Sequence, residues 1–492
     1  MSDLDTCLMA RFPGTHLPDW LRRWLDNGLG GVVLFATNIT GPAQLSALTA
    51  ELRSHNPDVL IAADEEGGIV TRVEARTGSS YPGNAALGAA DDTGLTRRVA
   101  ASMGAMLASG GIGLDLAPSA DVDANPANPV IGVRSFGADP DRVAAHTAEF
   151  VRGIQSSHVA ACAKHFPGHG RTDTDSHLAL PVAAATMAEL RATDLVPFRA
   201  AIAAGVRAVM TAHVVYPAVD EVPATISSIF LNETLRGECG FAGVIITDAL
   251  GMAAIGDDAA SGAGAVRSLA AGADLLCLAE SHAAQQRARD TLASALRRGD
   301  VPAGRVTESA ARVRELAAWA RPAAGSGPGP RQPAGPGLGA EAARRGLLVA
   351  TQRLPLSGTP YVLDAGGRMS RMLDDTASSL LGVLRERAPA VAGVRLTEPP
   401  TGPPTEAAAW ADPLIERAAG RPLVLAVADA HRRPWQAELV RQVLARRPDA
   451  VVVGTGTVHD AGLAAGSYLG TRGAGRANLE AAADVLLGQE RR

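Results

Sequence analysis

The sequence predicts an α/β protein, with a (β/α)8 TIM-type barrel followed by a smaller α/β sandwich domain. Within the first 320 residues, eight short apolar runs alternate with Ala-, Leu- and Arg-rich stretches of helical pattern. Such alternation predicts a parallel sheet, and eight units favour a closed barrel over an open sheet. A Pro- and Gly-rich stretch then precedes a second, shorter α/β pattern.

The predicted barrel strands are the eight apolar runs in chain order. They cover Cys7–Ala10, Gly31–Phe35, Val59–Asp64, Ile112–Ala117, Ala160–His165, Ala208–His213, Val244–Asp248 and Asp274–Ala279. The helical stretches between and after them are Pro18–Asn27, Ala43–His55, Leu95–Ser109, Asp141–Ser157, Met187–Ala204, Ala263–Ala271 and Ala283–Arg298.

The second pattern predicts a separate domain. Residues 1–320 are assigned to the barrel, residues 321–338 to a Pro/Gly-rich linker and residues 339–492 to the C-terminal α/β domain. Its expected strands are Tyr361–Asp364, Leu423–Val427 and Val451–Val453, with helices over Asp412–Ala418 and Gln436–Leu444. Because chemically reactive side chains are scarce there, we expect this domain to have a structural or regulatory role.

Composition restricts the class of protein. Apolar residues make up 47% and charged residues 20%, and the net charge is −5, which disfavours nucleic acid as a partner. The four cysteines form no CxxC pair, so reduced thiols and a cytoplasmic location are expected. The first residues do not resemble a signal peptide and no run of about 18 apolar residues occurs, so no membrane association is expected.

The chain has a single lysine, Lys164, among its 46 basic residues. A compact ammonium differs from a planar guanidinium, which suggests a specific role for this side chain. Lys164 begins the segment KHFPGHGRTDTDSH, which contains His165 and ends at His177. Asp175 lies two residues before His177, where its carboxylate could orient the imidazole for proton transfer. The competing interpretations of this loop are a metal site and purely structural histidines.

Further polar residues follow other predicted strands. Asp64 begins the sequence DEEGG and Arg72 follows it; together they could bind hydroxyls or form a simple turn. Arg134 lies in a Pro- and Asn-rich loop, where a solvated charge is the simpler interpretation. Asp248 ends a strand of β-branched residues and could be a nucleophile or a helix cap. His213 also ends a strand and could line a pocket or hydrogen-bond a neighbour.

The ordered motifs DEEGG, IGVRSFG, KHFPGHGRTDTDSH and ITDALGM resemble glycoside hydrolase family 3, and within it the β-N-acetylglucosaminidase branch. The resemblance covers most of Asp5–Ala318 and implies that Asp248 is the nucleophile. It implies that His177 is the acid/base and that Asp175 orients it. It places Asp64, Arg72, Arg134, Lys164 and His165 around the terminal sugar, with His213 and Met252 near the pocket.

The reaction implied is retaining hydrolysis through a glycosyl-aspartate, without a metal or other cofactor. The expected partner is a small soluble oligosaccharide, either a muropeptide fragment or a chitin oligosaccharide. A histidine acid leaves little negative charge beside an incoming anion, so inorganic phosphate could replace water as a partner and the enzyme could be a phosphorylase. A β-glucosidase and a non-catalytic sugar-binding module are two less favoured interpretations of the same motifs.

Overall fold

The computed structural model describes residues 3–175, 178–252, 262–278, 281–321, 337–366, 378–397, 407–418, 420–464 and 466–489. The chain forms two compact units. The first comprises Met1–Glu66, Thr93–Ile131 and Ser135–Gly335. The second comprises Gly67–Asp92, Gly132–Arg134 and Pro336–Arg492.

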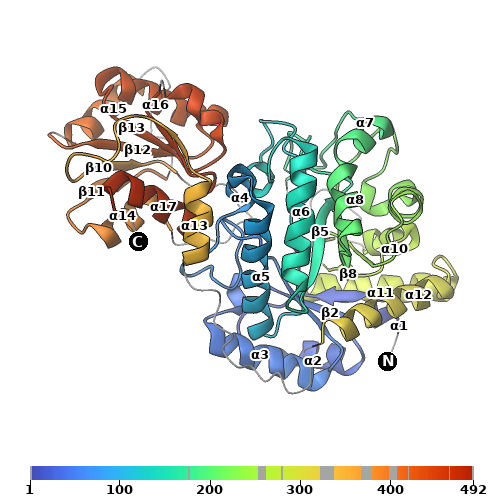
Figure 1. Cartoon of the computed structure of the whole chain (residues 1–492). Helices are drawn as coiled ribbons and strands as arrows, with labels where there is room; N and C mark the ends of the chain where they lie inside the picture. Colours follow the sequence, from blue (N-terminus) through green and yellow to red (C-terminus); the bar gives the residue numbers. More distant parts are fainter. Residues whose placement is uncertain are drawn as a thin grey trace. The chain divides into compact units, whose positions relative to one another are not determined.

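The first unit contains eight parallel strands in the order β7-β6-β5-β4-β3-β2-β1-β8 (Figure 1). The strands are β1 (Leu8–Ala10), β2 (Gly31–Leu34), β3 (Leu60–Ala63), β4 (Leu114–Asp115), β5 (Ala160–Phe166), β6 (Ala208–Thr211), β7 (Val244–Ile246) and β8 (Leu276–Cys277). A parallel bridge from Ile246 to Leu275, with the Thr247 amide donating to the Leu275 carbonyl at 3.0 Å, joins β7 to the start of β8. The sheet therefore closes, and the predicted eight-stranded barrel is confirmed.

Helices connect and surround these strands. They are α1 (Asp3–Thr6), α2 (Asp19–Asp26), α3 (Pro42–His55), α5 (Thr93–Ser109), α6 (Pro140–Gln155), α7 (Met187–Ala192), α8 (Leu195–Ala203), η4 (Ile229–Glu238), α10 (Ala263–Ala271), α11 (His282–Arg298) and α12 (Ala303–Trp319). The single helix predicted over Met187–Ala204 is wrong, because the chain breaks between α7 and α8. Pro197 explains the break, since its ring would clash with the carbonyl of Thr193 in a continuous helix.

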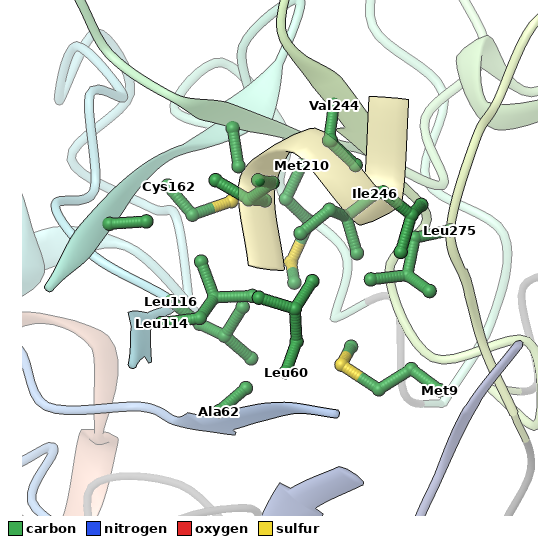
Figure 2. Close-up of a cluster of buried hydrophobic side chains, with 14 of the residues drawn as sticks. Met9, Leu60, Ala62, Leu114, Leu116, Cys162, Met210, Val244, Ile246 and Leu275 are labelled. Atoms are coloured by element: carbon green, nitrogen blue, oxygen red, sulfur yellow. The ribbon is translucent and has the colours of Figure 1, made fainter. Parts of the chain in front are cut away.

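Side chains fill the barrel interior (Figure 2). Alternate residues of each strand point inward, as the two-residue period of a strand requires. The pairs Leu60 and Ala62, Ala208 and Met210, and Val244 and Ile246 show this spacing. Residues of α12 join the same cluster. The barrel is therefore a packed core, and polar chemistry is confined to the loops at its ends.

The second unit contains a six-stranded sheet in the order β11-β10-β12-β13-β14-β9. The strands are β9 (Leu348–Ala350), β10 (Tyr361–Asp364), β11 (Ala392–Arg395), β12 (Leu423–Val427), β13 (Val451–Gly454) and β14 (Tyr468–Gly470), of which β9 alone pairs antiparallel. Separate apolar clusters lie on its two faces, so helices cover both sides. The helices are α4 (Asn84–Ala90), α13 (Gly337–Arg345), α14 (Leu380–Arg387), α15 (Ala407–Glu416), α16 (Pro434–Arg446) and α17 (Arg476–Leu487). The predicted α/β sandwich is confirmed.

The division into units differs from the boundary assigned from the sequence. Residues 67–92, which follow β3, and residues 132–134 group with the second unit, although both lie within the predicted barrel segment 1–320. Within the first of these segments, α4 packs against α13. Most of the predicted linker 321–338 lies outside the described residues. Among the described helices, none is long and apolar enough to cross a membrane.

Candidate active site

Lys164 lies near the carboxyl end of β5, and its side chain is only 2% exposed. Its Nζ contacts Asp64 Oδ1 at 2.7 Å and Glu66 Oε1 at 2.7 Å. Both carboxylates belong to the segment that follows β3. A buried ammonium is costly unless it is paired, and here two carboxylates compensate one positive charge. The structure thus fixes Lys164 and Asp64 together at the carboxyl end of the barrel.

His165 and His169 share one buried carboxylate, that of Asp121. Asp121 Oδ2 lies 2.7 Å from His165 Nδ1, and Oδ1 accepts from the His169 amide at 2.7 Å. Burial alone would raise the pKa of Asp121, but the His165 charge and these hydrogen bonds lower it to about 2. Asp121 is therefore ionised and holds the His165 ring in one orientation.

His169 is also buried, and its Nδ1 lies 2.9 Å from the Thr172 hydroxyl. Burial, followed by the neighbouring His165, lowers the pKa of His169 to about 4. The ring is consequently neutral at pH 7 and has a structural hydrogen-bonding role beside His165.

The loop that follows β5 is held by hydrogen bonds from other loops. The Asn128 amide donates to the His169 carbonyl at 2.8 Å and to the Thr172 hydroxyl at 3.2 Å. Tyr216 donates to the Gly168 carbonyl at 2.7 Å. A Cβ on Gly170 would lie 1.7 Å from a backbone oxygen, so only glycine fits there. The polar segment is thus an ordered part of the site as far as its description extends.

Asp248 follows β7 and is half-buried. Its Oδ1 accepts from the Ala249 amide at 2.7 Å. Burial raises the pKa of the Cys162 thiol inside the barrel, and the charges of Lys164, Asp64 and Asp248 also act on that pKa. These three charged groups therefore gather around the same end of the barrel core. The Asp248 charge also acts on the pKa of His169.

His213 is fully buried behind Asp248. Its Nδ1 lies 2.8 Å from the Thr225 hydroxyl and its Nε2 lies 3.1 Å from the Ala249 carbonyl. Both ring nitrogens thus bind protein groups, and His213 supports the turn that carries Asp248. Met252 is buried in the same turn, where its amide donates to the Ala249 carbonyl at 3.1 Å.

The remaining predicted residues lie elsewhere. Asp175 is half-buried, and its carbonyl accepts from the amides of Leu178 and Ala179 at 2.9 and 3.1 Å. His177 lies outside the described residues, so the proposed dyad has no described geometry. Arg72 is buried and Arg134 half-buried; both belong to segments grouped with the second unit.

Glu66, Asp121 and Asn128 were not assigned roles from the sequence. Glu66 lies inside the DEEGG motif, so its position beside a strand-end acid was the available signal. Asp121 and Asn128 belong to no polar cluster in the sequence, and their contacts depend on the fold. Among the described residues, no group of three His, Cys, Asp or Glu side chains could hold a metal ion.

Comparison with known proteins connects this geometry to a family. The profile of the "Glycosyl hydrolase family 3 N terminal domain" matches residues 17–316. The chain belongs to glycosyl hydrolase family 3. The resemblance inferred from the sequence motifs is thereby confirmed, and the chain is a glycoside hydrolase.

Relatives of this family 3 chain match it over one or both units. A protein named "Beta-hexosaminidase" from Pseudomonas aeruginosa is 42% identical over 275 residues, 54% of this chain and 80% of that protein. A solved family 3 beta-N-acetylglucosaminidase from Paenibacillus sp. str. FPU-7 is 33% identical with a TM-score of 0.88, covering 99% of this chain and 96% of that one. NagZ from Neisseria gonorrhoeae, also 33% identical, has a TM-score of 0.54 and covers 63% of this chain and 97% of its own.

Proposed function

We propose that this family 3 enzyme is a retaining exo-β-N-acetylglucosaminidase that removes terminal non-reducing N-acetylglucosamine from short soluble glycans. The proposal rests mainly on Asp248, a carboxylate that follows β7 and shares the carboxyl end of the barrel with the Lys164–Asp64 pair. Catalytic groups of such barrels lie at this end. The names of the relatives supply the sugar: they are hexosaminidases and N-acetylglucosaminidases.

In the proposed mechanism, Asp248 attacks the anomeric carbon while His177 protonates the leaving oxygen. A glycosyl-aspartate forms and the aglycone departs. The neutral imidazole then removes a proton from water, which releases the sugar with its β configuration retained. Asp175 orients the imidazole and stabilises its charged form.

Sugar hydroxyls would be held by charged side chains through charge-assisted hydrogen bonds. Lys164 and Asp64 provide a donor and an acceptor that are already fixed against each other at 2.7 Å. Arg72, Arg134 and His165 are the other proposed sugar-binding residues. Aromatic residues make up only 3% of the chain, which favours a pocket for one terminal sugar over a stacking platform for long polysaccharide.

The second candidate function is phosphorolysis by the same residues, with inorganic phosphate in place of water. The observation that favours it is the histidine in the acid position of the motif DSH, because a neutral imidazole repels an incoming anion less than a carboxylate does. We place the enzyme in the cytoplasm, where muropeptide fragments or chitin oligosaccharides would be its substrates.

Replacement of Asp248 tests the proposed nucleophile. Asp248→Ala should lower kcat for 4-nitrophenyl N-acetyl-β-glucosaminide by on the order of 10³-fold or more, because no glycosyl-enzyme can form. The exposed Asp290 offers a matched control, and Asp290→Ala should keep wild-type activity. Substantial turnover by Asp248→Ala would remove Asp248 from the mechanism.

Product analysis then separates the candidate reactions. Chitobiose and an N-acetylglucosaminyl-anhydromuramyl substrate are each incubated with and without phosphate. Free N-acetylglucosamine in both conditions supports hydrolysis, whereas a sugar phosphate as the main product identifies the phosphorylase.

A further inference from the structure

A cavity of about 410 Å³ lies at the amino-terminal end of the barrel strands. Its walls come from residues preceding β6, residues preceding β7 and the helix α12. Asp248 follows the other end of β7, so this cavity is separate from the proposed catalytic pocket. The volume falls within the range of about 300–1,000 Å³ that is usual for small-molecule sites.

Arg207 contributes a guanidinium to the lining of this cavity. Its Cζ lies 4.6 Å from the centre of the Trp319 ring, a cation–π contact that fixes the guanidinium plane. Throughout the described part of the chain, no carboxylate pairs with this guanidinium, and its buried Nε has no hydrogen-bond partner there. A buried N–H without an acceptor costs about 1–3 kcal/mol, so the site favours a ligand that accepts from it.

The neighbouring arginines are already paired within the protein. Arg312 also lines the cavity, but it contacts Asp274 Oδ1 at 3.2 Å and Glu308 Oε1 at 2.5 Å. Arg236 pairs with the same Asp274 and donates to the Phe241 carbonyl at 2.8 Å. Arg207 therefore differs from both, since its positive charge is directed to the cavity and not to a protein carboxylate.

The rest of the lining is apolar or small. Ile202, Val206, Phe241 and Leu316 provide hydrocarbon surface, and Glu315 is an exposed acid on the same lining. We propose that this cavity binds a small monocarboxylate with an apolar body. The carboxylate accepts from the guanidinium fork of Arg207, and the body packs on the hydrocarbon surface. Glu315 disfavours a second negative charge on the ligand.

Calorimetric titration of the full chain with 4-methylpentanoate tests the proposal, with 4-methylpentanamide as the uncharged counterpart. We expect saturable one-to-one binding of the carboxylate and at least tenfold weaker binding of the amide. Arg207→Met keeps an unbranched apolar side chain beside Trp319 and should weaken carboxylate binding at least tenfold. Unchanged affinity in this variant, or equal binding of acid and amide, would overturn the proposal.

Two further variants keep the test decisive if Arg207→Met does not fold. Arg207→Lys retains the charge without the fork and should bind the carboxylate several-fold more weakly than the wild type. Glu315→Gln should bind it at least as tightly as the wild type; weaker binding contradicts the role given to Glu315. Wild-type affinity in Arg207→Lys contradicts recognition by the fork.

Competition and activity separate this site from the proposed catalytic pocket. Saturating N-acetylglucosamine should leave carboxylate binding unchanged, whereas competition would place the ligand in the catalytic pocket and overturn the assignment. Both Arg207 variants should hydrolyse the aryl glycoside at the wild-type rate. Because binding is measured directly, its outcome does not depend on whether the proposed glycosidase activity is correct.

Discussion

Lys164 illustrates how one residue can be singled out by sequence and then explained by structure. It is the single lysine of the chain, and it lies 2.7 Å from each of two carboxylates. Lys164→Met would leave Asp64 and Glu66 without their buried cation, at a cost of about 3–5 kcal/mol. We expect the melting temperature of the barrel to fall by on the order of 10 °C in calorimetry.

The matched control for this substitution is Arg297→Met, which removes an exposed cation from α11 and should change stability by less than about 0.5 kcal/mol. Equal melting temperatures of Lys164→Met and the control would show that the buried ion pairs contribute nothing to folding.

His169 gives the barrel an acid-sensitive stability. Burial lowers its pKa from 6.5 to about 4 in the folded state, so between these values the unfolded chain binds a proton that the folded chain does not. Stability should therefore fall as the pH drops from 6.5 to 4, by on the order of 3 kcal/mol, and this contribution levels off below pH 4. His169→Asn keeps an amide near the Thr172 hydroxyl and does not titrate. Melting temperatures from pH 7 to pH 4 should fall less steeply in this variant, and identical slopes would contradict the assignment.

At the residue scale, dense polar motifs make functional residues predictable. Lys164, His165 and Asp64 stand in such motifs, and the structure gathers them at one end of the barrel. Asp121 could not be predicted, because its partners come from β5 while Asp121 itself lies in the loop after β4. Contacts of this kind become visible only when the strand order is known.

At the scale of elements, burial explains which strands were predictable. All eight barrel strands are buried apolar runs, and each of them was predicted. The strands β9, β11 and β14 were missed because they have only three or four residues, and β9 and β11 are also partly exposed at the sheet edges. Short edge strands carry a weak apolar signal.

The loop after β5 should depend on Asn128. Its amide nitrogen donates to the His169 carbonyl and its oxygen accepts from the amides of Val130 and Ile131, each at 2.8 Å. Asn128→Ala leaves these buried backbone groups unsatisfied, so we expect a loss of about 2–4 kcal/mol. Hydrogen exchange in peptides covering residues 164–175 should become markedly faster.

Asn125→Ala is the comparison, since Asn125 is less buried and donates to the same loop over 3.2 and 3.3 Å. It should accelerate exchange less than Asn128→Ala. The reverse order would show that Asn128 is not the principal support of the loop.

At the scale of the whole molecule, each unit has its own apolar core. Leu60 belongs to the barrel core and Leu425 to one face of the second sheet. Leu60→Ala and Leu425→Ala should each cost about 2–5 kcal/mol, because each removes buried hydrocarbon from a packed cluster. Calorimetry should show two unfolding transitions, with each substitution lowering a different one. A single transition shifted equally by both would contradict independent cores.

The sequence also predicted two units, but not their composition. A Pro- and Gly-rich stretch indicates where one domain ends, whereas residues 67–92 and 132–134 leave the barrel strands and join the second unit without any change in composition. Packing of α4 against α13 is a tertiary contact, which local patterns do not encode.

Covalent trapping tests the proposed chemistry most directly. The enzyme is incubated with a 5-fluoro N-acetylglucosaminyl fluoride, which slows hydrolysis of a glycosyl-enzyme, and is then digested and examined by mass spectrometry. We expect one sugar per chain, attached to the carboxylate of Asp248 in the peptide that follows β7. A sugar attached to another residue, or turnover of the reagent without any covalent adduct, would contradict Asp248 as the nucleophile.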